Sequence, residues 1–267
     1  MNSNGIRLVH RAMVPVRSQS SDAAEMVSQL LFGDLVEVLE TDRQWQRIRG
    51  LSDQYEGWID EKMSHPISEN WLATVNHWEY VDHASRVIIA QENQEETPLH
   101  LTYGCRIPIQ KGQEHQAIRQ IQLENWAAEI PQFTSKPARA ATPTNLIAIA
   151  AQYLGAPYLW GGKYLWGIDC SGLTQMVFAQ CGIQLPRDAS QQAKKGKEIA
   201  FGEHQAGDLA FFQNEKGKVT HVGIILENNL VRHAAGHVHD DLLIANGIFG
   251  KYTQTLTHVL CTIKRIH

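Results

Sequence analysis

A cysteine in a short polar motif has the residue type and the setting that nucleophilic catalysis needs. Cys170 lies in the segment Trp160–Val177, which reads WGGKYLWGIDCSGLTQMV and passes from a Gly-rich turn into an amphipathic helix. The pattern predicts that Cys170 lies at a helix N-terminus, where unsatisfied backbone N–H groups and the helix dipole favour the reactive thiolate. The same N–H groups would bind the oxyanion of a tetrahedral intermediate.

A thiol nucleophile needs a base, and two histidines follow in segments that have the pattern of strands. His221 opens the apolar run HVGIIL, and His233 lies in LVRHAAG on the next predicted strand. Adjacent antiparallel strands bring such imidazoles side by side. We therefore predict that His221 accepts the thiol proton of Cys170 and that His233 fixes the tautomer of His221.

A zinc site competes with this interpretation of His233. His237 and His239 follow in HAAGHVHDD, and together with Asp240 these side chains have the residue types of a zinc cluster. Gly236 argues against a helix in this segment, so the sequence favours a solvated loop. The expected catalytic site contains no metal and needs no cofactor.

The composition indicates a globular protein with a hydrophobic core and with no electrostatic preference for nucleic acid or membranes. The chain has 267 residues, of which 43% are hydrophobic and 19% charged, and its net charge is −4. That charge gives no reason to expect nucleic acid or an anionic membrane as a partner. The 4 cysteines are widely spaced and form no CxxC pair, which predicts free thiols. The oligomeric state is not predicted.

The beginning of the sequence bears on the location of the protein. Residues 1–18 read MNSNGIRLVHRAMVPVRS and contain neither an apolar h-region nor a small-residue cleavage site. No apolar run approaches the roughly 18 residues of a transmembrane helix. We expect a cytoplasmic protein, with a periplasmic location as the alternative if a signal has been removed.

Two small β-barrels are predicted before the segment that carries the chemistry. Short strands separated by turn residues predict the first barrel at 1–63. A weak repeat predicts the second, because QLLFGDLVEV and HLTYGCRIPI each place an aromatic residue and Gly within apolar segments. A Trp-containing strand follows each copy, at Trp58 and Trp126. We therefore expect a divergent second barrel at 64–132.

The pattern changes after residues 133–143, whose Pro, Ala, Ser and Thr content predicts a linker. Helical spacing follows at 145–154, with Thr144 as the predicted N-cap, and again at 170–181. Strand patterns return at 208–212, 221–226, 230–234 and 257–263. Helices followed by an antiparallel sheet predict an α+β catalytic domain at 144–267.

These motifs together resemble the NlpC-type cysteine peptidases, which are papain-like enzymes with a Cys-His-His triad. The matching motifs are PYLWGG at 157–162, DCSGL at 169–173, LPRDASQQ at 185–192, GDL at 207–209 and the two His motifs. The resemblance covers roughly the last 125 residues. It implies a papain-like domain in which Cys170, His221 and His233 form the triad and Tyr158 helps to bind the oxyanion.

The N-terminal part is similar to the bacterial SH3 domain of one subgroup, through EMVSQLLFG at 25–33 and YEGW at 55–58. That subgroup cleaves γ-D-glutamyl–diamino acid bonds in peptidoglycan stem peptides with a free N-terminal L-alanine. The resemblance implies a small murein peptide as substrate and a role in cell-wall recycling. It leaves open whether the diamino acid is meso-diaminopimelate or L-lysine.

The resemblance also implies substrate-binding residues. Glu25 and Tyr55 would reach into the groove, and Asp169 would pair with the L-alanine ammonium, since each charge offsets the desolvation of the other. Asp169 would alternatively cap the helix that begins at Cys170. The residues expected to line the pocket are Ser171, Asp188 and Ser190.

Three other functional classes remain open at this stage. One is an acyltransferase or amidase on the same fold, in which the acceptor at the thioester differs. Another is a non-catalytic protein that docks wall peptides, against which the intact Cys170, His221 and His233 argue. The third is a zinc hydrolase.

Overall fold

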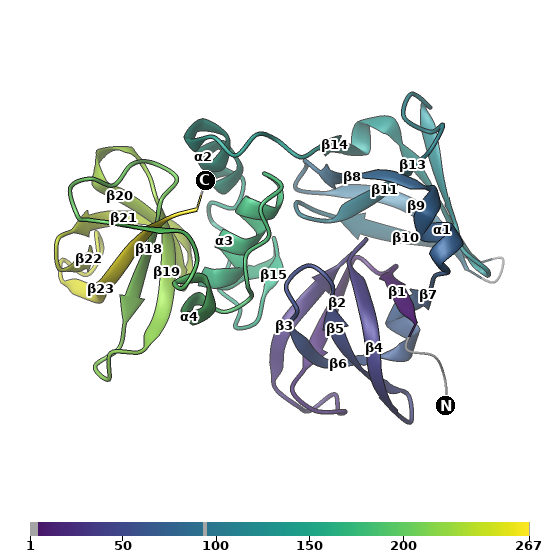
Figure 1. The fold of residues 1–267 in the computed structure, drawn as a ribbon, viewed down its shortest axis with the longest axis horizontal. Coiled ribbons are helices and arrows are strands. Elements are labelled where there is room, and N and C mark those ends of the chain that lie inside the picture. The colour runs from purple at the N-terminus through teal and green to yellow at the C-terminus, as the bar shows by residue number, and fades with distance from the viewer. Residues whose placement is uncertain (1–4, 93–94, 267) are drawn as a thin grey trace. The chain divides into compact units, whose positions relative to one another are not determined.

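The computed structural model describes residues 5–92 and 95–266, and the chain divides into two compact units between Ala138 and Arg139 (Figure 1). The first unit is built almost entirely of short strands, and the second combines helices with a β-barrel. This is the α+β class that the sequence predicts. Within the described residues, no helix has the length and apolar character needed to span a lipid bilayer.

The first barrel is a seven-stranded antiparallel sheet with the strand order β3-β2-β6-β5-β4-β1-β7. Alternate residues of β2, including Val14 and Val16, are buried in one apolar core. The elements of the barrel are β1 (Ile6–Val9), β2 (Met13–Arg17), β3 (Met26–Leu31), β4 (Leu35–Asp42), β5 (Trp45–Gly50), β6 (Glu56–Asp60), η1 (Glu61–Met63) and β7 (Ser64–Pro66).

A second set of strands repeats this arrangement. Its elements are α1 (Glu69–Thr74), β8 (Val75–Val81), β9 (Arg86–Glu92), β10 (Glu95–Leu101), β11 (Arg106–Gln110), β12 (Ile118–Gln122), β13 (Trp126–Pro131), η2 (Gln132–Thr134) and β14 (Ser135–Pro137). β8 pairs with β11 and β14, as β1 pairs with β4 and β7. β13 pairs with β9 and β12, as β6 pairs with β2 and β5.

Two glycines mark the predicted repeat in the structure. Gly33 between β3 and β4 and Gly104 between β10 and β11 both have a φ of +86°. Glycine adopts this conformation without the steric cost of a Cβ atom. Equivalent turns of the two sets of strands therefore share one backbone conformation, and the assignment of the second set as a divergent barrel stays a prediction.

Aromatic rings join the two barrels of the first unit. Trp126 is 1% exposed, and its ring centroid lies 5.6 Å from that of His10 and 6.0 Å from that of Phe32. The backbone N–H of Arg106 donates to the carbonyl oxygen of Phe32 at 2.7 Å. These contacts explain why two barrels form one compact unit.

The buried His10 makes the stability of the first unit depend on pH. His10 is 2% exposed, and burial, followed by the nearby positive charge of Arg11, lowers its pKa from 6.5 to about 3. Below pH 6.5 the unfolded chain therefore binds a proton that the folded chain excludes, so the free energy of unfolding falls on acidification. We expect His10 to contribute a loss that approaches about 1.4 kcal/mol per pH unit as the pH falls toward 5.

Urea unfolding followed by tryptophan fluorescence measures this effect, because Trp126 contacts His10. The His10→Phe variant should lose less stability than the unmodified chain between pH 7 and pH 5. Equal losses in the two chains would show that His10 is not the group responsible.

The second unit is a closed β-barrel with helices packed against it. Its strands lie in the order β17-β23-β18-β19-β20-β21-β22, and a further pairing of β22 with β23 closes the sheet. An apolar cluster that includes Phe212, Val231 and Ile263 forms the core of the barrel. α3 packs against β19 and β20, and α2 packs against α3 (Figure 1).

The helices of this unit are α2 (Pro143–Ala151), α3 (Cys170–Ala179), α4 (Ala189–Gln192) and η3 (Glu227–Asn229). Its strands are β15 (Lys163–Tyr164), β16 (Gly167–Ile168), β17 (Lys197–Ile199), β18 (Leu209–Gln213), β19 (Val219–Ile225), β20 (Leu230–Ala235), β21 (His237–Ile244), β22 (Gly247–Phe249) and β23 (Leu256–Arg265).

Two boundaries differ from the sequence prediction. The N-cap of α2 is Thr142, whose side chain accepts the N–H of Asn145, and not Thr144. Pro143 then occupies the first helical position, where its missing N–H costs nothing. The predicted linker at 133–143 begins too early, because β14 within it pairs with β8.

Candidate active site

Cys170 is the first residue of α3, and Asp169 is the N-cap of that helix. The Asp169 Oδ1 atom accepts the backbone N–H of Gly172 at 2.7 Å. Gly172 lies so close to the preceding turn that an added Cβ would be 2.2 Å from the carbonyl oxygen of Gly162. The Gly-rich motif and the cap therefore place the thiol at the helix N-terminus, as predicted.

The surroundings of the thiol oppose ionisation. Cys170 is buried, and burial, followed by the negative charge of Asp169, raises the pKa of its thiol to about 12. The backbone N–H groups of Val222 and Ser171 act in the opposite direction but do not outweigh burial. The helix N-terminus therefore favours the thiolate without producing it alone, and the thiol depends on a base.

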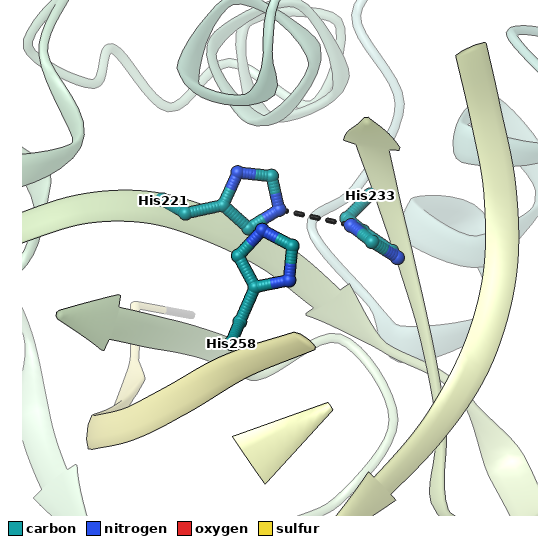
Figure 2. Close-up of side chains that lie close together, drawn as sticks. All are labelled: His221, His233 and His258. Carbon is teal, nitrogen blue, oxygen red and sulfur yellow. Dashed lines mark hydrogen bonds between the residues drawn. The ribbon is translucent and has the colours of Figure 1, made fainter. Parts of the chain in front are cut away.

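Figure 2 shows the two predicted histidines in direct contact. His221 lies on β19 and His233 on β20, two strands that pair in antiparallel register with Gly223 opposite His233. The His221 Nε2 and His233 Nδ1 atoms are 2.9 Å apart, which is a hydrogen bond. Val222, the next residue after His221, donates its N–H toward the Cys170 thiol, so β19 lies against the start of α3.

Asp241 on β21 extends this pair of histidines and was not predicted. Its Oδ2 atom lies 3.3 Å from His233 Nε2, and its Oδ1 atom accepts the backbone N–H of Lys251 at 2.9 Å. Burial raises the pKa of Asp241, but the hydrogen bonds from Lys251 and His233 outweigh it and hold that pKa below its usual value. Asp241 is therefore an ionised, buried acceptor.

An ionised carboxylate only accepts hydrogen bonds, and this fixes the proton positions along the row. His233 must carry its proton on Nε2 to donate to Asp241, so His233 Nδ1 accepts. His221 must then donate from Nε2, which leaves the lone pair on His221 Nδ1. The row from Asp241 to His221 therefore presents Nδ1 of His221 as the basic atom.

Both histidines of the row are neutral in this environment. Burial, followed by the neighbouring His258 and His233, lowers the pKa of His221 well below 6.5. Burial, followed by His239, lowers the pKa of His233 to about 4. A neutral His221 and a protonated Cys170 thiol have the protonation states of a general base and a nucleophile before proton transfer.

A third imidazole beside the row was also missed. His258 on β23 stacks on His221, with ring centroids 4.2 Å apart and an interplanar angle of 23° (Figure 2). His239 on β21 places its Nε2 atom 3.2 Å from Asp241 Oδ2. The sequence signal was the alternation in HVHDD, which puts His239 and Asp241 on one face of a strand.

The segment 237–240 is therefore part of strand β21 and not a solvated loop. The zinc cluster considered from the sequence also contained the wrong carboxylate. Asp240 points to the other face of β21, where Arg232 holds it through hydrogen bonds of 2.7 and 2.8 Å. Among the described side chains, the groups able to hold a metal are His221–His233–His258 and His233–His239–Asp241.

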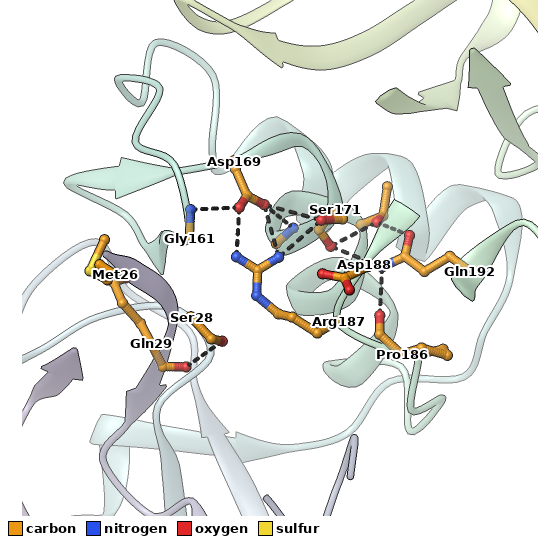
Figure 3. A network of polar contacts seen from close by, with 12 residues as sticks. Met26, Ser28, Gln29, Gly161, Asp169, Ser171, Pro186, Arg187, Asp188 and Gln192 are labelled. Carbon is orange, nitrogen blue, oxygen red and sulfur yellow. Dashed lines mark hydrogen bonds and ion pairs between the residues drawn. The ribbon is translucent and has the colours of Figure 1, made fainter. Parts of the chain in front are cut away.

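Asp169 is the centre of a second network, which Figure 3 shows. Arg187 binds both carboxylate oxygens, at 3.0 Å to Oδ1 and 2.6 Å to Oδ2. Gly161 N–H donates to Oδ2, and the Ser171 hydroxyl contacts Oδ1. With the cap to Gly172, five donors surround a carboxylate that offers about four lone-pair sites. Asp169 therefore caps α3 and anchors Arg187, and its pairing with a substrate ammonium stays a prediction.

The other predicted pocket residues of the second unit lie near this network. The Ser171 hydroxyl accepts a hydrogen bond from Arg187 at 2.9 Å, and Asp188 is the N-cap of α4, which contains Ser190. Tyr158 is half-buried, and burial, followed by the Cys170 and Asp169 charges, raises its pKa to about 12. Its hydroxyl therefore remains a hydrogen-bond donor at neutral pH.

Glu25 and Tyr55 lie in the first unit. Glu25 is exposed and directly precedes β3, and Tyr55 is partly buried and directly precedes β6. Tyr55 lines a pocket of about 400 Å³ on the first barrel, together with Arg47 and Trp58. The substrate-binding roles of Glu25 and Tyr55 stay predictions.

Family models match part of each unit. Residues 155–259 match the NlpC/P60 family, and residues 16–63 match the bacterial dipeptidyl-peptidase Sh3 domain. The first match contains Tyr158, Cys170, His221 and His233, and the second contains Glu25 and Tyr55.

Two similar proteins from different Bacillus species share one name. The gamma-D-glutamyl-L-lysine dipeptidyl-peptidase of Bacillus subtilis is 37% identical over 128 residues, which are 46% of this chain and 41% of that protein. The protein of the same name from Bacillus cereus is 26% identical over 230 residues, 80% of this chain and 68% of that protein. This chain thus spans less than half the length of the first relative.

A solved structure shares the fold. The crystal structure of an NlpC/P60 family protein from Bacillus cereus superposes with a TM-score of 0.78, covering 97% of this chain and 99% of that chain at 19% identity. The second unit therefore resembles the NlpC/P60 family over residues 155–259, and the first barrel resembles the bacterial dipeptidyl-peptidase Sh3 domain over residues 16–63.

Proposed function

We propose that this protein hydrolyses the γ-D-glutamyl–diamino acid bond of peptidoglycan stem peptides that have a free N-terminal L-alanine. The observation that carries the proposal is the row Asp241–His233–His221, which presents a basic nitrogen on β19. Helix α3, which begins with Cys170, packs against the same strand. The names of the Bacillus relatives indicate which bond is cleaved. Recycling of cell-wall peptides in the cytoplasm is part of the proposal.

The proton positions in the site determine the order of the proposed steps. His221 Nδ1 takes the proton of the Cys170 thiol as sulfur attacks the γ-D-glutamyl carbonyl carbon. Backbone N–H groups at the start of α3 and the hydroxyl of Tyr158 donate to the oxyanion. The imidazolium of His221 then protonates the leaving amine, and a thioester forms on Cys170. Water, deprotonated by His221, hydrolyses the thioester.

A digestion assay tests the proposal. The chain is incubated with L-Ala-γ-D-Glu-meso-diaminopimelate, with its L-lysine analogue and with the N-acetylated form of each, and products are identified by mass spectrometry. We expect L-Ala-γ-D-Glu from the free-amine peptides only and none from Cys170→Ala. Cleavage of the acetylated peptides as well would keep the peptidase and remove amine recognition by Asp169, Glu25 and Tyr55. No cleavage of any peptide would overturn the proposed function.

A further inference from the structure

Three side chains behind the two catalytic histidines have the donor atoms of a metal site. His233 Nε2 and His239 Nε2 lie 3.3 and 3.2 Å from Asp241 Oδ2, and all three atoms lie within 4.8 Å of one another. A tetrahedral zinc ion with bonds of about 2.0–2.1 Å has its ligand atoms about 3.3 Å apart. The observed separations to Asp241 thus match those of zinc ligands.

Each of the three side chains is also oriented by its other polar atom. His239 Nδ1 lies 2.9 Å from the carbonyl oxygen of His237 and must donate to it. With this proton on Nδ1, a neutral His239 ring turns its Nε2 lone pair toward Asp241 Oδ2, as a cation shared by the two atoms requires. Asp241 Oδ1 is held by the Lys251 N–H, and His233 Nδ1 by His221. Metal-binding histidines and carboxylates in proteins are oriented by such outer hydrogen bonds.

The site is accessible to an ion and to water. His233, His239 and Asp241 line a pocket of about 250 Å³, together with Tyr252 and His258. A site with three protein ligands leaves a fourth position for water in the pocket. The other possible group, His221–His233–His258, is less suitable because two of its nitrogens form the 2.9 Å hydrogen bond and it contains no carboxylate.

We propose that this chain binds a divalent transition-metal ion, such as Zn²⁺, through His233, His239 and Asp241, and that the bound ion switches off the peptidase. A metal on His233 Nε2 moves the proton of that ring to Nδ1, which then donates to His221 Nε2. His221 must carry its proton on Nδ1 and no longer accepts one from Cys170. The inhibitory step rests on the proposed function, whereas the binding site does not.

Binding is measured on the full chain, stripped of metal with a chelator, by calorimetric titration with Zn²⁺ and by the absorption spectrum of bound Co²⁺. We expect one ion per chain and at least 100-fold weaker binding by His239→Asn. Cys170→Ala, His258→Asn and His237→Asn should bind as the unmodified chain does. Unchanged binding in these controls would exclude Cys170, His258 and His237 as ligands of the ion. Absence of binding, or binding unchanged in His239→Asn, would overturn the site.

The inhibitory role has its own measurement. Zn²⁺ should suppress cleavage of the free-amine peptide at least 10-fold, and EDTA should restore it. His239→Asn should cleave at the basal rate and resist Zn²⁺ at concentrations that inhibit the unmodified chain. Equal inhibition of both chains would overturn the switch. Metal binding by a chain that cleaves none of the peptides would leave the site intact and reject the proposed function instead.

Discussion

The Asp241→Asn variant is expected to fold normally and to lose roughly 10²- to 10⁴-fold in kcat/KM toward the free-amine peptide. The Lys251 N–H donates to one Asp241 oxygen at 2.9 Å, so the oxygen of Asn would remain there. The Asn NH₂ group would then face His233 Nε2 and require it to accept. Every proton along the row would reverse, and His221 Nδ1 would carry a proton in place of a lone pair.

The neighbouring carboxylate provides a matched control. Asp240 lies one residue away on the opposite face of β21, bound to Arg232, and Asn would keep an oxygen for that contact. Asp240→Asn should retain kcat/KM within a few-fold. Steady-state kinetics compare kcat/KM of the two variants, and circular dichroism verifies that both are folded. Full activity in Asp241→Asn would mean that His221 is oriented without the carboxylate.

Replacement of Arg187 by Met should destabilise the second unit by about 3–5 kcal/mol. Arg187 is 1% exposed and Asp169 6% exposed, so the substitution leaves a buried carboxylate without its cation. Two strong hydrogen bonds to Asp169 and one to Ser171 are lost together. The start of α3 would lose its anchor, and with it the position of Cys170.

Urea denaturation of three variants separates the buried charge from the loss of packing. The double variant Arg187→Met, Asp169→Asn should recover part of the lost stability, since no charge remains buried. Lys264→Met removes a cation from the same unit, but its partner Glu198 is largely exposed, so the loss should stay below about 1 kcal/mol. A loss this small in Arg187→Met would mean that Asp169 reaches water or is protonated.

The local parts of the site are predictable from the sequence. Cys170 begins a helix because Asp169 caps it and Gly172 permits the close turn, and both signals lie within three residues of the nucleophile. His221 and His233 meet because consecutive apolar runs form neighbouring antiparallel strands. The repeated glycine turns of the first unit also follow from the repeat in the sequence.

The missed parts depend on contacts that local patterns do not encode. The segment HVHDD has the polarity of a loop, yet it forms β21 because His239 and Asp241 face a row of histidines and not solvent. Arg187 and Asp169 are 18 residues apart, and no periodicity indicates that they pair. His258 stacks on His221 only because the barrel closes.

The base and the nucleophile differ in how much chain must be ordered to form them. His221, His233 and Asp241 lie on three consecutive strands, and only 20 positions separate the first from the last. Cys170 lies 51 positions before His221. Since the entropy cost of closing a loop grows with its length, the contacts among the three strands close a shorter loop than the contact that brings Cys170 to β19. A chain in which only these three strands were ordered would hold an oriented base without its nucleophile and would be inactive.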